Sequence, residues 1–322
     1  MTTFKGIRGT TIEVLSSDPS NPEEGQIWYN SSSGTLKGYQ NVTLNAWSAG
    51  GNLNTARGGL ASANSGTQTA ALAFGSYTPL SSATESYNGT SWTSKNSMNT
   101  ARGYLAGAGT QTSALAFGGT PPVTGTTESY NGTSWTTSPS SMSVVRQQHG
   151  GVGSQTAALA IFGSNPSPGT AQTQTEAYNG TTWTSVGSGN TGRGGVGTAG
   201  TQTAALAFSG YNGISPLTVT ESYNGTSWTS VNSLNTARTK PAGSGTQTAA
   251  LCFGGEPTTG ATEKWNGTAW TSNPTGLATG RYSFGGAGSQ SAALAFGGNP
   301  GSLNTTEAWY TTKLSIRTLT TS

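Results

Sequence analysis

Short segments in which small and large apolar side chains alternate recur along the chain, each ended by glycine or by polar turn residues. In the segment 113–119 (SALAFGG), alanine alternates with Leu115 and Phe117, so small and large side chains fall on opposite faces. Strand signals also occur at 103–109, before this segment, and at 126–130 and 133–137, after it. The pattern predicts four consecutive antiparallel strands.

The connections between these strands differ in composition. Thr110 and Gln111 form a tight turn between the first two strands, and a longer loop separates the second from the third. Asn131-Gly132 precedes the fourth strand and predicts a two-residue type I′ hairpin turn, in which both residues have positive φ. The polar loop SPSSMSVV then leads to the next unit.

The whole four-strand unit recurs six times. An arginine opens each copy, at intervals of 43 to 47 residues: Arg57, Arg102, Arg146, Arg193, Arg238 and Arg281. A glutamine follows at the first turn: Gln68, Gln111, Gln155, Gln202, Gln247 and Gln290. A glutamate marks the third strand: Glu85, Glu128, Glu176, Glu221, Glu263 and Glu307. A tryptophan follows in five copies: Trp92, Trp135, Trp183, Trp228 and Trp270. A repeat of this length, built from strands, indicates a propeller or a solenoid.

One such sheet has two faces to cover and two open edges. Stacking the copies face to face around an axis covers the faces, and a ring closes the array. Alanine and glycine in the first two strands suit the crowded axis, whereas Trp and Tyr in the last two suit the perimeter. We therefore predict an all-β fold, a six-bladed β-propeller of four-stranded antiparallel blades with a short N-terminal arm.

The ends of the chain predict how the ring closes. The last copy lacks the Asn-Gly turn, whereas residues 35–48 hold a spare pair of strand signals around Tyr39 and Trp47. We expect these residues to complete the sixth blade beside the C-terminal strand. The alternative is that residues 313–319 (KLSIRTL) form the outer strand and the N-terminal hairpin packs elsewhere. The predicted domains are a docking arm at 1–34 and a closed propeller at 35–322.

Several of these positions together resemble the kelch repeat, over about residues 35–310. A glycine pair ends the second strand in three copies: Gly118-Gly119, Gly254-Gly255 and Gly297-Gly298. An aromatic residue is followed five residues later by a tryptophan: Tyr87 and Trp92, Tyr130 and Trp135, Trp265 and Trp270. The spacing is shorter than usual for kelch, and the pair reads Gly75-Ser76, Gly163-Ser164 and Ser209-Gly210 in the other three copies.

Composition narrows the possible partners. Only 8% of the residues are charged, the net charge is +3, and lysines and arginines are scattered singly, so no nucleic-acid partner is expected. Cys252 lies in an apolar strand and is expected to be a buried, unreactive thiol. No apolar stretch approaches a membrane span, and the N-terminus lacks a signal-peptide core, so we expect synthesis in a host cytoplasm without membrane insertion.

Six of the eight arginines and six of the ten glutamates occupy repeat positions. One interpretation is a ring of arginines around the axis that binds an anionic ligand. The other is one Arg–Glu ion pair per blade or between neighbouring blades. Equal numbers at matched positions favour the ion pair, because an unpaired buried charge is very costly. These twelve residues would then be structural, and Arg102→Ala would destabilise the fold rather than abolish binding.

Candidate catalytic residues are few. The chain holds one histidine, His149, and one aspartate, Asp18, which lies outside the repeats. A Ser-His-Asp triad, a two-histidine copper site and a zinc or calcium site therefore lack their residues. Glu256 is the sole propeller glutamate outside the repeat position, so a pair of catalytic carboxylates is also missing. We expect a protein that is not an enzyme, without cofactor or metal, in which His149 packs or hydrogen-bonds.

The two kinds of connection fall on opposite rims of a propeller. The first–second and third–fourth turns are nearly identical among the copies, whereas the second–third and fourth–first loops differ in length and content. Variation confined to one rim is typical of a scaffold with a recognition face; ordinary solvated loops are the alternative. The candidate contact residues on the variable rim are Tyr77, Tyr211, Lys95, Lys240 and Glu256. Tyrosine suits stacking on a sugar ring or burial at a protein interface.

Residues 1–34 stand apart from the repeats. The segment 25–39 (GQIWYNSSSGTLKGY) resembles a short hairpin common in bacteriophage tail and fibre proteins, and repeats of the TQTAALAFGG kind resemble propeller proteins of phages that infect aquatic bacteria. The resemblance implies a virion protein of tail or fibre type, used in host attachment and released by lysis. It would contact other virion proteins through residues 1–34 and a host-surface glycan or protein through the variable rim, and it could form a homo-oligomer within the virion. The alternatives are a virion decoration protein with structural contacts only, a cellular kelch-type interaction module, and a carbohydrate-active enzyme.

Overall fold

The computed structural model describes residues 12–165 and 171–319 of the chain. The regular elements in these two ranges are strands, and no helix there is long and apolar enough to cross a membrane. The chain divides into two compact units, Ala46–Trp309 and the remainder, up to Asn45 and from Tyr310 onward. These bounds differ from the predicted domains 1–34 and 35–322, because the long strands β3 (Thr35–Gly50) and β26 (Thr306–Thr318) each contribute to both units.

The Ala46–Trp309 unit is the predicted six-bladed propeller, with one sheet per blade. Blade 1 holds β4 (Ala61–Ser62), β5 (Leu72–Ser76), β6 (Ser81–Tyr87) and β7 (Trp92–Lys95). Blade 2 holds β8 (Ala106–Thr110), β9 (Ser113–Phe117), β10 (Thr127–Tyr130) and β11 (Trp135–Thr137). Blade 3 holds β12 (Gly150–Gly153), β13 (Ala158–Ile161), β14 (Thr175–Tyr178) and β15 (Trp183–Val186). Blade 4 holds β16 (Gly197–Gly200), β17 (Ala205–Phe208), β18 (Thr220–Tyr223) and β19 (Trp228–Val231). Blade 5 holds β20 (Ala242–Gly245), β21 (Ala250–Phe253), β22 (Thr262–Trp265) and β23 (Trp270–Asn273), and blade 6 holds β24 (Gly285–Gly288), β25 (Ala292–Phe296), β26 and β3.

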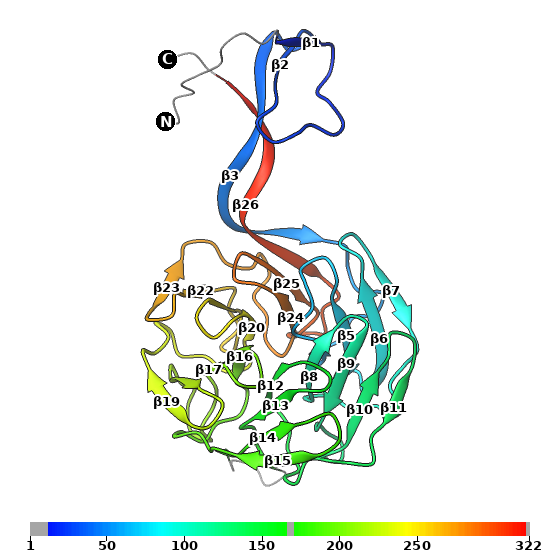
Figure 1. Ribbon diagram of the computed structural model, residues 1–322, viewed down its shortest axis with the longest axis vertical. Helices are drawn as coiled ribbons and strands as arrows, with labels where there is room; N and C mark the ends of the chain where they lie inside the picture. The colour runs from blue at the N-terminus through cyan, green and yellow to red at the C-terminus, as the bar shows by residue number, and fades with distance from the viewer. Residues whose placement is uncertain (1–11, 166–170, 320–322) are drawn as a thin grey trace. The chain divides into compact units, whose positions relative to one another are not determined.

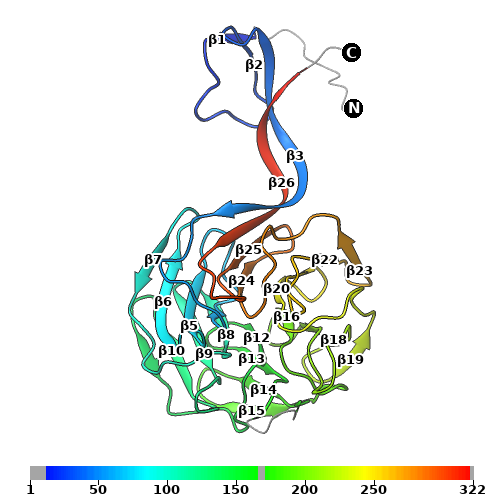
Figure 2. The same ribbon diagram turned by 180° about the vertical axis from the view of Figure 1, so that it is seen from behind.

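In blades 1 to 5 the strands run from the centre of the ring outward in chain order, and in blade 6 the order is β24, β25, β26 and then β3. Figure 1 shows β8, β12, β16, β20 and β24 near the centre and β7, β11, β15, β19 and β23 at the perimeter, and Figure 2 shows the same order from behind. The small residues of the inner strands allow close approach there, as the composition predicted: a Cβ added to Gly107 would lie 2.2 Å from the carbonyl oxygen of Ser62 in the neighbouring blade. Inner strands therefore contact one another mainly through backbone.

Aromatic side chains join each blade to the blade before it. A phenylalanine at the loop end of each second strand packs on the fourth-strand tryptophan of the following blade, with ring centroids 4.8–5.0 Å apart: Phe74 and Trp135, Phe117 and Trp183, Phe162 and Trp228, Phe208 and Trp270, Phe253 and Trp47, Phe296 and Trp92. Each indole Nε1–H also donates to a threonine hydroxyl on the third strand of the preceding blade, at 2.9–3.1 Å. The stabilising contact is thus repeated six times around the ring.

Trp47 shows that the N-terminal strand closes the ring. It occupies the position of the five repeat tryptophans, and its Nε1–H donates to Thr262 of blade 5 at 2.9 Å. β3 is one continuous strand next to β26: its part from Ala46 onward completes the sixth blade as predicted, whereas residues 35–45 belong to the smaller unit and do not form a further strand of the blade. The alternative, in which residues 313–319 form an outer strand of their own, is wrong. Those residues extend β26 along β3, and Leu319 N–H donates to the carbonyl of Leu36 at 2.8 Å.

The third-to-fourth strand connection differs from the predicted turn. Only the glycine of each Asn-Gly pair has positive φ, for example Gly132 at 92°, and the loop closes over four residues with Asn131 N–H donating to Ser134 O. The Asn131 Oδ1 accepts the backbone N–H groups of Thr133 and Ser134 at 2.9 and 2.8 Å. The side chain therefore takes the role that the predicted type I′ backbone would have played, and the asparagine keeps an ordinary φ.

Glutamine side chains bridge the blades on this same side of the propeller. Each repeat glutamine donates from Nε2 to two backbone carbonyls of the preceding blade, one on its second strand and one on its third. Gln111, for example, reaches Ala71 and Tyr87 in blade 1. We call the rim formed by these turns and the Asn-Gly loops the turn rim, and the opposite rim, formed by the second–third and fourth–first loops, the loop rim.

The smaller unit contains β1 (Glu13–Leu15), β2 (Ile27–Asn30) and the outer halves of β3 and β26. β1 pairs in parallel with β2, which pairs antiparallel with β3. Asp18 Oδ1 accepts hydrogen bonds from Trp28 Nε1 and Asn30 Nδ2 at 3.0 and 2.8 Å, and these bonds lower the pKa of the Asp18 carboxyl.

Candidate recognition face

The repeated arginines and glutamates lie beneath the loop rim, where they form one ion pair within each blade. All six arginine side chains are 0–1% exposed. The anion-binding ring of arginines is therefore wrong, since no guanidinium reaches the surface. Burial lowers the pKa of five of these guanidinium groups while the facing carboxylate opposes the shift (Arg57, Arg102, Arg146, Arg193, Arg281).

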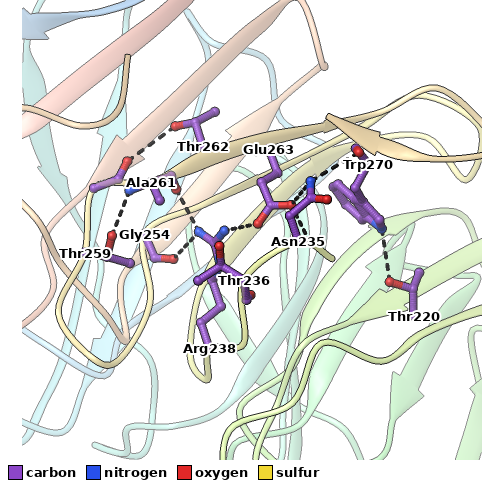
Figure 3. A network of polar contacts seen from close by, with 11 residues as sticks. Thr220, Asn235, Thr236, Arg238, Gly254, Thr259, Ala261, Thr262, Glu263 and Trp270 are labelled. Carbon is purple, nitrogen blue, oxygen red and sulfur yellow. Dashed lines mark hydrogen bonds and ion pairs between the residues drawn. The ribbon is translucent and has the colours of Figure 1, made fainter. Parts of the chain in front are cut away.

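Figure 3 shows the arrangement in blade 5. Arg238 donates to Glu263 and to the carbonyl oxygens of Gly254 and Ala261, at 3.2 and 2.8 Å, which lie on the second–third loop. The second oxygen of Glu263 accepts the backbone N–H of Asn235 at 2.8 Å, in the link from blade 4. The same glutamate-to-link bond occurs in every blade, at 2.7–2.8 Å. The ion pair thus holds both kinds of loop in place under the surface.

A closed ring of backbone hydrogen bonds surrounds the axis on the loop rim. The residue two positions after each arginine has φ between 50° and 67°: Gly59, Tyr104, Gln148, Gly195, Lys240 and Ser283. Each donates its N–H to the carbonyl of its counterpart in the preceding blade, and Gly59 donates to Ser283, at 2.7–3.1 Å. Four of the six are not glycine, although left-handed φ costs such residues roughly 1–2 kcal/mol. We call these six residues the axial ring.

The loop rim carries a further ring of matched backbone positions outside the axial ring. In blades 2 to 6, the third residue after the second strand pairs with the residue that follows the arginine, as in Gly103 with Thr120, Gly194 with Tyr211 and Thr239 with Glu256. A residue next to the end of the second strand has φ between 57° and 67° in every blade: Gly75, Gly118, Phe162, Ser209, Gly254 and Gly297. The counterpart of the glycine pair in blade 3 is therefore Phe162-Gly163, one residue earlier than the predicted Gly163-Ser164. The shift arises because Ile161 occupies the strand position that Phe117 occupies in blade 2.

Three of the five predicted contact residues come together. Tyr211, Lys240 and Glu256 line one groove of about 640 Å³ on the loop rim, over blade 4 between blades 3 and 5. Lys240 Nζ lies 2.8 Å from Glu256 Oε2 and 5.6 Å from the centre of the Tyr282 ring. Tyr77 lies elsewhere on the rim, in blade 1, with its ring 4.5 Å from that of Tyr104. Lys95 ends the outermost strand β7 and takes no part in the groove.

The aromatic group around Tyr104 extends from the axis outward. Burial raises the pKa of the Tyr104 hydroxyl, and the neighbouring Tyr77, Tyr282 and Glu256 raise it further. The hydroxyl therefore stays protonated and can both donate and accept a hydrogen bond. Sequence reasoning missed Tyr104 and Tyr282 because both lie within two residues after a repeat arginine, where the pattern predicts an inner strand.

In the described part of the Ala46–Trp309 unit, exposed large hydrophobic side chains are confined to the loop rim. Among the described residues of the Ala46–Trp309 unit, the large hydrophobic side chains that are exposed are Tyr77 (41%), Leu80 (48%), Val145 (40%), Tyr211 (41%) and Ile214 (85%). All five lie in second–third or fourth–first loops. The exposed large hydrophobic side chains of this unit therefore all lie on the rim whose loops vary.

Blade 1 carries an insertion that reaches across the axis near the turn rim. Its arginine and glutamine are 11 residues apart, whereas the interval is 9 in the other five copies, a signal that sequence reasoning overlooked. Asn64 donates to the carbonyl of Gly151 in blade 3, and Ser65 Oγ donates to that of Gly153 at 2.8 Å. Asn64 lies between a hollow of about 110 Å³ beside the inner strands and one of about 250 Å³ at the turn rim.

His149 and Cys252 are both buried. His149 follows the axial ring in blade 3, at the position that Leu60 and Leu105 hold in blades 1 and 2, and its ring packs 5.5 Å from that of Phe117. Burial, together with the positive charges of Arg146 and Arg102, holds the pKa of His149 well below its usual range. Burial raises the pKa of the Cys252 thiol to about 12, so this thiol stays protonated.

The comparison with known structures bears on the fold. The chain is similar to the solved structure of YjhT, a β-propeller, with a TM-score of 0.64 and 10% sequence identity over 83% of this chain and 99% of that chain. No protein-family model matches the chain, and its sequence matches no curated protein. This similarity supports the β-propeller fold.

Proposed function

We propose that this protein is a non-enzymatic recognition module of a bacteriophage virion, of tail or fibre type, whose loop rim binds the host surface. The observation that carries the proposal is the concentration of all five exposed large hydrophobic side chains of the propeller's described residues on one rim. On that rim a uniform backbone presents different side chains in each blade. Propellers serve many functions, so the argument rests on this surface and not on the fold.

Two features support the virion setting. The segment 25–39 resembles a hairpin of phage tail and fibre proteins, and in the structure it forms the hairpin of β2 and β3 outside the propeller unit. The kelch-like repeats place few charges and many Ser, Thr and Asn residues on the surface, which resembles phage propellers. Residues 1–34 then contact other virion proteins, and release by lysis carries the chain out of the host cytoplasm.

The proposal is tested on virions and on the purified full chain. Mass spectrometry of purified particles should detect the chain, and electron microscopy with an antibody against it should label the tail. Fluorescently labelled chain should bind the bacteria that the virus infects and should slow adsorption of the virus. The double variant Tyr77→Ala/Tyr211→Ala should bind these cells at least tenfold more weakly, because it removes an exposed ring from opposite sides of the face.

Other outcomes would redirect the proposal. A chain present in particles that binds no cell would instead be a decoration protein. A chain absent from particles would overturn the virion role and leave a cellular interaction module. Turnover of a sugar substrate by the purified chain would overturn the non-enzymatic part.

A further inference from the structure

The groove over blade 4 exists because that blade lacks side chains where other blades have them. The two residues after the arginine are Gly194 and Gly195 in blade 4, but Gln147 and Gln148 in blade 3 and Thr239 and Lys240 in blade 5. Blade 1 also has two glycines there, but its space is filled. A Cβ on Gly58 would lie 2.4 Å from the Asn299 side chain, and one on Gly59 would lie 2.8 Å from Tyr77 Cβ.

The space above Gly194 is open. The nearest atoms to a Cβ there belong to Gly163 and Ser164, at ordinary contact distances of 3.5–3.6 Å, and Gly194 lacks positive φ. Glutamine occupies the matched position in blade 3, where Gln147 pairs with Ser164 as Gly194 pairs with Tyr211. The backbone at this position therefore accepts a long side chain, and its absence from blade 4 leaves a groove of about 640 Å³. Small-molecule sites commonly measure roughly 300–1,000 Å³.

The groove carries no net charge. The charged residues among its described lining are Lys240 and Glu256, which form an ion pair 2.8 Å long and are 23% and 40% exposed. The other polar groups of the described lining include the side-chain amides of Gln147, Gln148 and Asn165. An amide or a Lys–Glu pair offers a donor and an acceptor side by side, which is what a ligand hydroxyl needs because it both donates and accepts.

The backbone around the groove is already hydrogen-bonded. Gly194 and Tyr211 exchange both of their N–H···O bonds, at 3.0 and 2.8 Å, and Thr239 and Glu256 do the same at 2.9 and 2.7 Å. An extended peptide binds chiefly by pairing with a free strand edge, and these pairs leave no such edge in the groove. Recognition must therefore use side chains, with the half-exposed ring of Tyr211 as the apolar contact.

We propose that this groove binds an uncharged hexopyranose unit of a glycan. The apolar C–H face of the sugar ring packs on Tyr211, and its hydroxyls bond to the Lys240–Glu256 pair and to the glutamine amides. This inference rests on the proposed recognition function and assigns it a ligand class. Because Gly194 has no side chain, the groove is open at this position, and its specificity depends on that opening.

The test fills the groove without disturbing the fold. Gly194→Gln places in blade 4 the side chain that blade 3 already has, and Tyr211→Ala removes the stacking ring. Thr133→Gln adds a similar side chain on the turn rim and is the control. Purified full chains are applied to an array of neutral hexose oligosaccharides, acidic glycans and peptides. Wild type and Thr133→Gln should bind neutral glycans equally, and the two groove variants should bind at least tenfold more weakly with an unchanged melting temperature.

Several results would overturn the inference: binding only to acidic glycans or only to peptides, no binding to any glycan, or full binding by a folded Gly194→Gln variant. If Gly194→Gln lowers the melting temperature, Tyr211→Ala alone decides. The same proteins are also applied to host cells. Cell binding that survives in both groove variants leaves the proposed function standing and removes the groove from it, whereas the absence of cell binding in wild type removes the proposed function itself.

Discussion

The two rims of the propeller are built from the same six copies but treat their side chains in opposite ways. On the turn rim, every glutamine makes the same two bonds to the preceding blade, and asparagine loops cap themselves in the same manner. On the loop rim, the backbone repeats just as closely, but the axial ring carries Gly, Tyr, Gln, Gly, Lys and Ser in turn. The side chains on a rim can differ between blades when they are not the groups that keep the loop backbone in place.

The difference follows from what lies beneath each rim. Under the loop rim, the buried Arg–Glu pairs and the axial ring of backbone bonds hold the loops, so surface residues are free to differ. On the turn rim, the glutamine at the surface is itself the connection between blades, so it stays the same in every copy. The comparison can be tested by removing one support at a time.

The largest effect is expected from the pair under the loop rim. Arg238→Ala leaves Glu263 buried without its partner, and the free energy of unfolding should fall by about 3–5 kcal/mol, measured by chemical denaturation. The double variant Arg238→Met/Glu263→Gln removes both charges and should regain part of the loss. If Arg238→Ala costs no more than a surface substitution, the loop rim is held by something else.

A smaller loss is expected on the turn rim. Gln111→Ala removes the bonds to the carbonyls of Ala71 and Tyr87, and the unfolding free energy should fall by about 1–3 kcal/mol. Thr110→Ala changes the adjacent exposed residue and should leave stability nearly unchanged. A loss as large as that of Arg238→Ala would erase the distinction drawn between the rims.

The next effect depends on pH. His149 has a depressed pKa in the folded protein, so below its unfolded pKa of about 6.5 the unfolded chain binds more protons than the folded one. The unfolding free energy of wild type should therefore decrease as the pH is lowered below 6.5, by up to about 1.4 kcal/mol per pH unit. In His149→Leu, which copies Leu60 and Leu105, the fall between pH 6.5 and 5.5 should be smaller. Parallel pH curves for the two proteins would contradict this.

The smallest change should be a gain. Ser209 has φ of 62° and a buried hydroxyl without a hydrogen-bond partner, at a position that four other blades fill with glycine. Ser209→Gly should raise the unfolding free energy by about 1 kcal/mol, because it relieves the backbone strain and removes the unpaired hydroxyl. Ser76→Gly is the matched opposite, since Ser76 donates to the carbonyl of Gly58 at 3.1 Å; it should lower stability.

Most of the fold could be predicted from the sequence alone, because the same four-strand pattern occurs six times in it. The strand predicted at 113–119 and those after it correspond to β9, β10 and β11, and the spare Trp47 correctly indicated how the ring closes. The first predicted strand began too early, at 103 instead of Ala106, because Gly103 and Tyr104 belong to the loop rim. The type I′ turn predicted at Asn131-Gly132 was wrong, because hydrogen bonds to the asparagine side chain close the loop in place of that backbone turn.

The sequence by itself determined the number of blades, the order of strands within each blade and the rim on which variation falls, because these follow from period, alternation and parity. Only the tertiary structure decided that the recurrent charges are buried within blades, that six residues close a ring of backbone bonds around the axis, and that Tyr211, Lys240 and Glu256 share a groove while Tyr77 and Lys95 do not. Those outcomes depend on contacts between residues 16 or more positions apart in the chain. A local sequence pattern does not specify which of several equivalent residues will be the partner.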